Sequence, residues 1–212
     1  ESNVTVYGVA DVSYDQTRNG DSTANGAGVT SNRISSNCAN IGFKGAEDMG
    51  GGLKAIWQIV SVIGIDNATG PITNFFANRN TFAGLSGDKW GSLTLGRNDT
   101  PYKTSTRGLD VFTVHLPDNR SLMGQGTTGF DKRFTDTARY DSPNFNGFKV
   151  SAAYTASAES NTGSTADVKG RAEALSGTYT TGPFTGIVAY QKNTFGSVAG
   201  AVAGADSNPA PP

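Results

Sequence analysis

A two-residue period runs through most of this sequence and constrains its fold more than any other feature. In residues 3–15 the even positions are Val, Val, Gly, Ala, Val and Tyr, whereas the odd positions are mostly polar. Successive side chains of a β-strand point to opposite faces, so this alternation predicts a strand with one apolar and one polar face. The strand would have about 12 residues, roughly twice the usual length in soluble proteins.

The alternation recurs in eight further segments, which gives nine predicted strands and no amphipathic helix of ordinary length. These segments lie at about 40–44, 54–59, 79–86, 92–95, 135–142, 148–155, 171–180 and 184–191. We therefore expect an all-β fold.

The connections between the predicted strands alternate strictly between short and long. The short ones are rich in Gly, Pro, Asn and Asp, as tight turns require, and lie at 48–52, 87–91, 142–147 and 181–183. The long ones are polar and lie at about 17–33, 65–78, 99–134 and 158–170. In an up-and-down antiparallel sheet this places every turn at one edge and every long loop at the other. Such asymmetry is typical of outer-membrane barrels and rare in compact soluble domains.

Composition agrees with a transmembrane antiparallel up-and-down β-barrel. Hydrophobic residues make up only 36% of the chain and glycine accounts for 28 of 212 residues, as expected for a wall with lipid on one side and water on the other. A net charge of −1 gives no general attraction to nucleic acid. The alternative is a soluble or surface-exposed β-sandwich that binds glycan or protein ligands, in which the apolar faces would form the core.

The sequence offers little material for catalysis. It contains one cysteine, Cys38, and one histidine, His115, so it cannot form an internal disulfide and lacks the residues of a zinc centre or a catalytic triad. We expect no enzymatic activity, no cofactor and no metal site, and we expect His115 to be a structural or solvated loop residue.

Several segments, in order from residue 4 to about residue 155, resemble the general trimeric outer-membrane porins of beta-proteobacteria. They are residues 4–11, 41–48, 50–55, 78–85, 91–97, 139–143 and 147–148. The resemblance implies a 16-stranded, homotrimeric, water-filled channel in the outer membrane of a Gram-negative bacterium. Its implied partners are outer-membrane lipid, lipopolysaccharide and small hydrophilic solutes or anions that diffuse passively, with no role for nucleic acid.

The resemblance also divides the chain into parts. Residues 1–212 would form a single barrel domain, and the connection 99–134 corresponds to the third loop of the family, which folds inward as a constriction. Residues 196–212 are rich in Ala, Gly and Pro and are predicted to be a low-complexity loop or tail. Because nine strands are just over half of 16, we expect the barrel to be incomplete at the C-terminal end of this sequence.

Charged residues on the polar faces are the candidate pore-lining residues. Strand parity places Lys44, Lys54, Lys149, Arg133 and Arg139 on these faces. Arg97 shares the parity of two leucines and needs a kink near Gly96 to turn inward.

The resemblance adds to this set and to its expected selectivity. Arg79, Arg97 and Arg133 match recurrent arginines of the family, whereas Asn40 stands where many relatives have arginine. Asp110 and Asp118 would be counter-charges on the loop. We therefore predict a weak to moderate anion preference. The alternatives are that each arginine is a salt-bridged wall residue and that the two aspartates are solvated or form turns.

Overall fold

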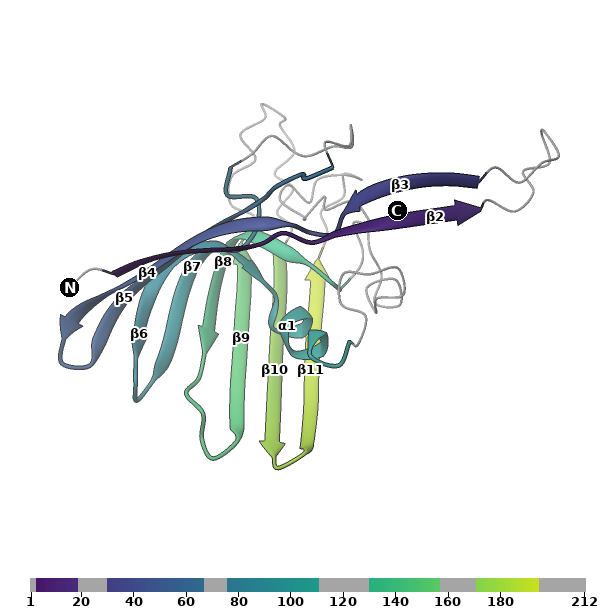
Figure 1. Cartoon of the computed structure of the whole chain (residues 1–212). Helices are drawn as coiled ribbons and strands as arrows, with labels where there is room; N and C mark the ends of the chain where they lie inside the picture. The colour runs from purple at the N-terminus through teal and green to yellow at the C-terminus, as the bar shows by residue number, and fades with distance from the viewer. Residues whose placement is uncertain (1–2, 19–29, 67–75, 111–129, 157–170, 195–212) are drawn as a thin grey trace, which may run out of the picture.

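A computed structural model of the chain describes residues 3–18, 30–66, 76–110, 130–156 and 171–194 (Figure 1). The described residues form a nine-stranded antiparallel sheet in the order β1-β4-β5-β6-β7-β8-β9-β10-β11, with β1 and β11 at its edges. A separate hairpin pairs β2 with β3. The strands are β1 (Asn3–Val9), β2 (Val12–Arg18), β3 (Thr30–Ser36), β4 (Asn40–Gly50), β5 (Leu53–Val62), β6 (Thr81–Gly87), β7 (Gly91–Asp99), β8 (Arg133–Asp141), β9 (Phe148–Ala156), β10 (Arg171–Thr181) and β11 (Phe184–Thr194).

The first two long strands are each interrupted once. Ala10 and Asp11 separate β1 from β2, and a short break that includes Cys38, with φ +58°, separates β3 from β4. The breaks lie opposite each other, since the Asn37 amide donates to the Asp11 carbonyl at 2.9 Å. The β2–β3 hairpin is therefore the continuation of β1 and β4 beyond the sheet (Figure 1). Taken together, the described segments confirm the nine predicted strands.

Every short turn lies at one edge of the sheet, as predicted (Figure 1). The turn between β4 and β5 is made by three consecutive glycines, Gly50, Gly51 and Gly52, with φ of +84°, +64° and +81°. Side chains with a Cβ adopt this left-handed region only at a cost, so the Gly-Gly-Gly run explains why the chain reverses there.

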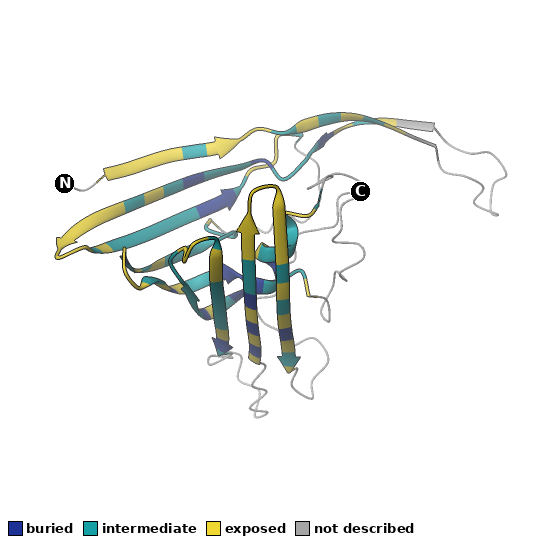
Figure 2. Ribbon diagram, turned by 90° about the horizontal axis from the view of Figure 1, so that it is seen from below, coloured by how far each residue is buried: buried dark blue, intermediate teal, exposed yellow. Residues whose placement is uncertain are grey.

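The two faces of the sheet have opposite chemistry, and the apolar face is the exposed one. We call it the outer face; on it, Phe184 is 74% exposed and Val188 is 78% exposed. The opposite, inner face carries polar side chains such as Thr94, Thr137 and Ser176, all buried. Figure 2 shows this alternation as dark and light bands along β10. In a soluble protein the apolar face would be covered, so the exposed outer face is typical of a wall that borders lipid.

The sandwich alternative needs a second sheet packed on the apolar face. Within the described residues no such sheet covers it, because the other sheet is the β2–β3 hairpin that continues β1 and β4. The structure therefore favours the barrel wall. Nor does any helix in the described ranges have the length and apolar character needed to cross a membrane.

A short helix that the sequence reading missed, α1 (Pro101–Arg107), begins directly after β7. Thr100 caps it, since its Oγ1 accepts a hydrogen bond from the Lys103 amide at 3.2 Å, and Pro101 occupies its first turn. The helix contacts β9, β10 and β11. It lies on the inner face, because Ala172, Ala174 and Ser176 of β10 are buried whereas the outer residues of that strand are exposed.

Candidate functional site

A cluster of charged side chains joins β7, α1 and β8 on the inner face, and Arg133 lies at its centre. The Arg133 side chain is 4% exposed, and its Nη2 lies 3.1 Å from Asp99 Oδ1 and 3.2 Å from Asp99 Oδ2. Its Nε donates to Asn80 Oδ1 at 2.7 Å. Two hydrogen bonds join Asn80 and Asp99. Asn80 Nδ2 donates to Asp99 Oδ2 at 2.9 Å, and the Asp99 backbone amide donates to Asn80 Oδ1 at 3.0 Å.

Lys103 brings α1 into the same cluster. Its ammonium is 2% exposed and lies 3.0 Å from Asp99 Oδ1 and 3.5 Å from Asp131 Oδ1. Burial lowers the pKa of Lys103, whereas the charge of Asp99 opposes that shift. We call Asn80, Asp99, Lys103, Asp131 and Arg133 the loop-base cluster.

The loop-base cluster closes the base of the connection between β7 and β8. The Thr100 amide donates to the Lys132 carbonyl at 3.2 Å, so the two ends of this long connection meet there. The cluster contains two cations and two carboxylates, and its formal charges cancel. It can therefore hold the connection in place without leaving a net charge on the inner face.

Arg139 forms a second attachment between α1 and the sheet. Its Nε and Nη2 each lie 2.8 Å from a carboxylate oxygen of Asp141. Its Nη1 donates to the Asp99 carbonyl at 2.8 Å, and its Nη2 also donates to Thr104 Oγ1 of α1 at 3.2 Å. The guanidinium thus links β8, the end of β7 and the helix.

Strand β7 contains the kink near Gly96 that Arg97 would need in order to turn inward. Gly96 has φ +137°, and the β7–β8 register shifts between Gly96 and Asn98. Arg97 is half-buried and donates from Nε to the Asn78 carbonyl at 3.1 Å. Arg79, also half-buried, donates from Nη1 to the Cys38 carbonyl at 3.0 Å. That either arginine lines a channel stays a prediction.

Gly96 is expected to be intolerant of a side chain. A Cβ there would lie 2.5 Å from the Thr81 carbonyl oxygen of the neighbouring strand, in a backbone conformation that L side chains rarely adopt. We expect Gly96→Ala to lower the free energy of unfolding by about 1–3 kcal/mol, measured as the temperature at which the folded protein in detergent changes its gel mobility.

Gly186→Ala is the matched control for this measurement, because Gly186 is also a strand glycine and a Cβ there would meet nothing within 4 Å. Equal effects of the two substitutions would contradict the strain argument.

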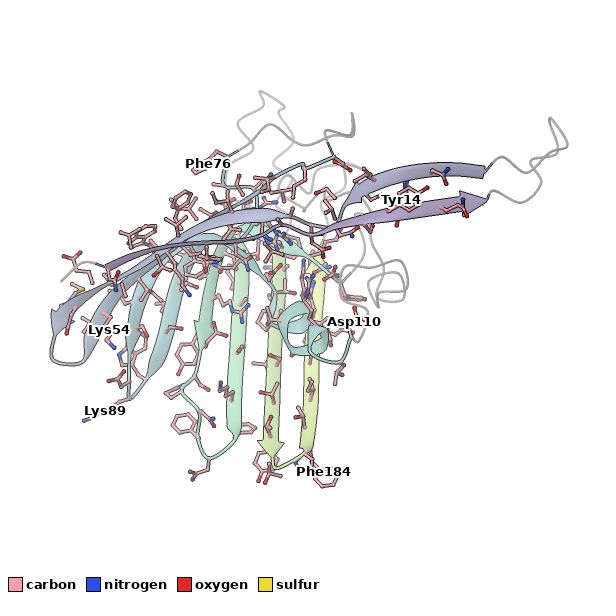
Figure 3. All side chains as sticks on the ribbon, in the orientation of Figure 1. Tyr14, Lys54, Phe76, Lys89, Asp110 and Phe184 are labelled. Carbon is pink, nitrogen blue, oxygen red and sulfur yellow. The ribbon has the colours of Figure 1, made fainter. Side chains whose placement is uncertain are left out.

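Three lysines on the inner face differ from Arg133 and Arg139, because they have no carboxylate partner among the described residues. Lys44, Lys54 and Lys149 are exposed and, in the described part of the chain, form no ion pair. The Lys44 ammonium lies 5.3 Å from the centre of the Tyr7 ring. Lys54 lies near the short-turn edge of the sheet (Figure 3). These lysines therefore present their positive charge to the space in front of the inner face.

The structure describes one of the two candidate loop aspartates, Asp110. Asp110 is half-buried and directly follows the turn that ends α1, where its amide donates to the Arg107 carbonyl at 3.2 Å (Figure 3). Asp118 and His115 lie outside the described residues, as does the predicted tail at 196–212. Among the residues that are described, no group of three or more potential metal ligands occurs.

Sequence reasoning named Arg133 and Arg139 but missed Asn80, Asp99, Lys103 and Asp131. One signal was available, because Thr100 followed by Pro101 is a typical helix start. A helix beginning there places Asp99 and Lys103 four residues apart on one side of its first turn, which is the observed ion pair. Asn80 offered no signal, since it reaches the cluster only through the pairing of β6 with β7.

Comparisons with known proteins agree with the geometry. The model of the Gram-negative porin family matches residues 1–210. The major outer membrane protein P.IA of Neisseria meningitidis serogroup C is 37% identical over 117 residues, which are 54% of this chain and 28% of that protein. The P.IB protein of Neisseria gonorrhoeae is 33% identical over 128 residues, 59% of this chain and 34% of that protein. The chain thus spans about a third of the length of these relatives.

A solved structure shares the fold. The anion-selective porin from Comamonas acidovorans superposes with a TM-score of 0.74 at 24% sequence identity, covering 92% of this chain and 59% of that one.

Proposed function

The chain belongs to the Gram-negative porin family, and on this premise we propose that the whole protein forms a water-filled channel for passive diffusion of small hydrophilic solutes. Family membership places the chain in the bacterial outer membrane as part of a β-barrel and confirms the predicted fold class. That the protein acts as a channel and not as an enzyme is part of the proposal. The channel's solutes, its selectivity and its assembly with other subunits are part of the proposal.

One observation carries the proposal: the polarity of the sheet is inverted. Large apolar side chains on the outer face are exposed, for example Leu95 at 60% and Tyr190 at 60%. The inner face carries threonines, serines, glutamines and lysines, and α1 packs on this side. Lipid satisfies the first surface and water the second, whereas without a membrane the apolar outer face would be exposed to water.

We propose a weak to moderate anion preference that rests on the inner-face lysines rather than on the paired arginines Arg133 and Arg139. Arg133 and Arg139 face carboxylates at hydrogen-bond distance, so their charges are largely cancelled locally. Lys44, Lys54 and Lys149 have no such partner among the described residues and stay exposed. A surplus of unpaired positive charge raises the local concentration of anions in a channel. The Comamonas acidovorans neighbour, described as anion-selective, supports the same direction.

We further propose that the protein assembles as a homotrimer within outer-membrane lipid and lipopolysaccharide. The exposed outer face offers an apolar surface to lipid chains or to other subunits, and general porins are trimers. Connection 99–134 is proposed as the constriction loop, since its first helix lies on the inner face. Asp110 and Asp118 are proposed as its counter-charges, and Arg79 and Arg97 as wall residues that border it.

The lysine assignment predicts the result of a charge-removal experiment. In planar bilayers with a KCl gradient, the whole protein is expected to give a reversal potential of anion-preferring sign. The triple variant Lys44→Gln, Lys54→Gln and Lys149→Gln should lower the anion-to-cation permeability ratio at least about twofold, because three positive charges without a carboxylate partner among the described residues leave the lumen.

The control removes lysines that do not face the lumen. Lys89 lies in a short turn and Lys192 on the outer face, so Lys89→Gln with Lys192→Gln should leave the ratio nearly unchanged. Clear cation preference of the wild-type channel would contradict the proposal, and equal effects of the two variants would contradict the role of the inner-face lysines.

A further inference from the structure

The inner face contains a hollow of about 350 Å³ across β1, β4, β5 and β6, separate from the loop-base cluster. Its lining includes Asn3, Thr5, Lys44, Ile56, Gln58 and Phe82. The volume is in the range of pockets that hold small organic molecules.

Strand register explains why the wall is hollowed at this place. Thr5, Lys44, Gln58 and Phe82 are direct neighbours in one row across the four strands. The next row toward the short turns reads Asn3, Ala46, Ile56 and Gly84. Ala46 and Gly84 are short, so the second row leaves space beside the long side chains of the first.

The hollow combines an apolar floor with one positive charge. Ile56 and Phe82 supply apolar surface, and both are half-buried rather than fully covered. Among the described residues that line the hollow, Lys44 is the one cation and none is a carboxylate. The contact of Lys44 with the Tyr7 ring at 5.3 Å is weak, so an anion can replace it.

One polar group that lines the hollow, the Gln58 amide, is held in place. Gln58 Nε2 donates to the Asn80 carbonyl at 3.3 Å, which fixes the orientation of the amide. Thr5 adds a hydroxyl and Asn3 an amide on the opposite side. A ligand with one charged end and an apolar body therefore meets matching chemistry at each end.

We propose that this hollow is a solute-binding subsite for small monocarboxylates with an aromatic or branched apolar body. The carboxylate pairs with the Lys44 ammonium, and the body lies on Ile56 and Phe82. The inference rests on the proposed channel function, because the solute reaches the hollow only through a water-filled lumen. Small anions without an apolar body gain the charge contact alone and pass without being held.

The test measures chloride current through the whole protein in planar bilayers while benzoate is added, with acetate and inorganic phosphate as parallel additions. We expect benzoate to reduce the current saturably and the other two anions to show no saturable effect. Lys44→Gln should weaken the apparent affinity for benzoate about fivefold or more, since a charge-assisted contact is lost. Ile56→Thr, which keeps a β-branched strand residue, should weaken it about threefold or more through lost apolar contact.

Lys149→Gln is the matched control, because it removes the same charge from the inner face outside the hollow. It should change the benzoate affinity less than about twofold. A non-saturable benzoate effect, an equal loss in Lys44→Gln and Lys149→Gln, or equally tight binding of phosphate would each overturn the subsite while leaving the channel function standing. A wild-type protein that reconstitutes without any conductance would instead contradict the proposed function itself.

Discussion

Replacement of Asp99 by asparagine is expected to lower the free energy of unfolding by about 3–5 kcal/mol, the effect typical of breaking a buried ion pair. Asp99 is the shared carboxylate of Lys103 and Arg133, whose side chains are 2% and 4% exposed. Asparagine is almost isosteric and keeps a hydrogen-bond acceptor, but it leaves two buried cations with too little compensating charge. The repulsion between the two cations is then no longer offset by a carboxylate between them.

The measurement is the temperature at which the folded protein in detergent loses its compact gel mobility. Asp48→Asn is the matched control, since Asp48 is exposed at the end of β4 and should shift this temperature little. A combined variant, Asp99→Asn with Arg133→Met, removes one of the two stranded cations and leaves Lys103 with Asp131, so it should recover part of the loss. Equal unfolding temperatures for Asp99→Asn and Asp48→Asn would contradict the proposed role of the cluster.

The sheet could be predicted from the sequence because its signal is local. Alternation in segments such as 148–155 and 184–191 reports which face each side chain occupies, and the turn residues report where the chain reverses. The outer face is mostly apolar and the inner face mostly polar, so one period assigns both. Parity also showed that Arg97 would need a kink near Gly96 to turn inward, and the strand is irregular at that residue.

The site could be predicted only in part because its contacts are not local. Parity placed Arg133 and Arg139 on the inner side, but their partners come from β6, β7 and α1. Seven residues of helix give too few turns for a 3.6-residue period to be visible. Parity also cannot distinguish an exposed charge from a cancelled one, so it could not show that the lysines are exposed whereas Arg133 and Arg139 are paired with carboxylates.

The second large effect is expected from Arg139→Gln. This substitution distinguishes an arginine that holds α1 against the wall from one that acts only as a charge in the lumen. The substitution removes the contacts of the guanidinium with the Asp99 carbonyl and with Thr104, so α1 loses an attachment to the sheet. It also leaves the Asp141 carboxylate with Ser151 Oγ, at 2.6 Å, but without its cation. Because the proposed constriction begins with α1, we expect single-channel conductance to rise by about half and anion preference to fall.

Arg107→Gln distinguishes attachment from charge alone. Arg107 lies in the last turn of α1 and carries the same charge as Arg139, but it forms no ion pair with another described residue. Its removal should lower anion preference slightly and leave conductance unchanged, since the helix stays bound through Lys103 and Arg139. Equal conductance changes in Arg139→Gln and Arg107→Gln would mean that Arg139 acts as a lumen charge. A larger change in Arg139→Gln means that this arginine controls the channel by holding α1 against the wall.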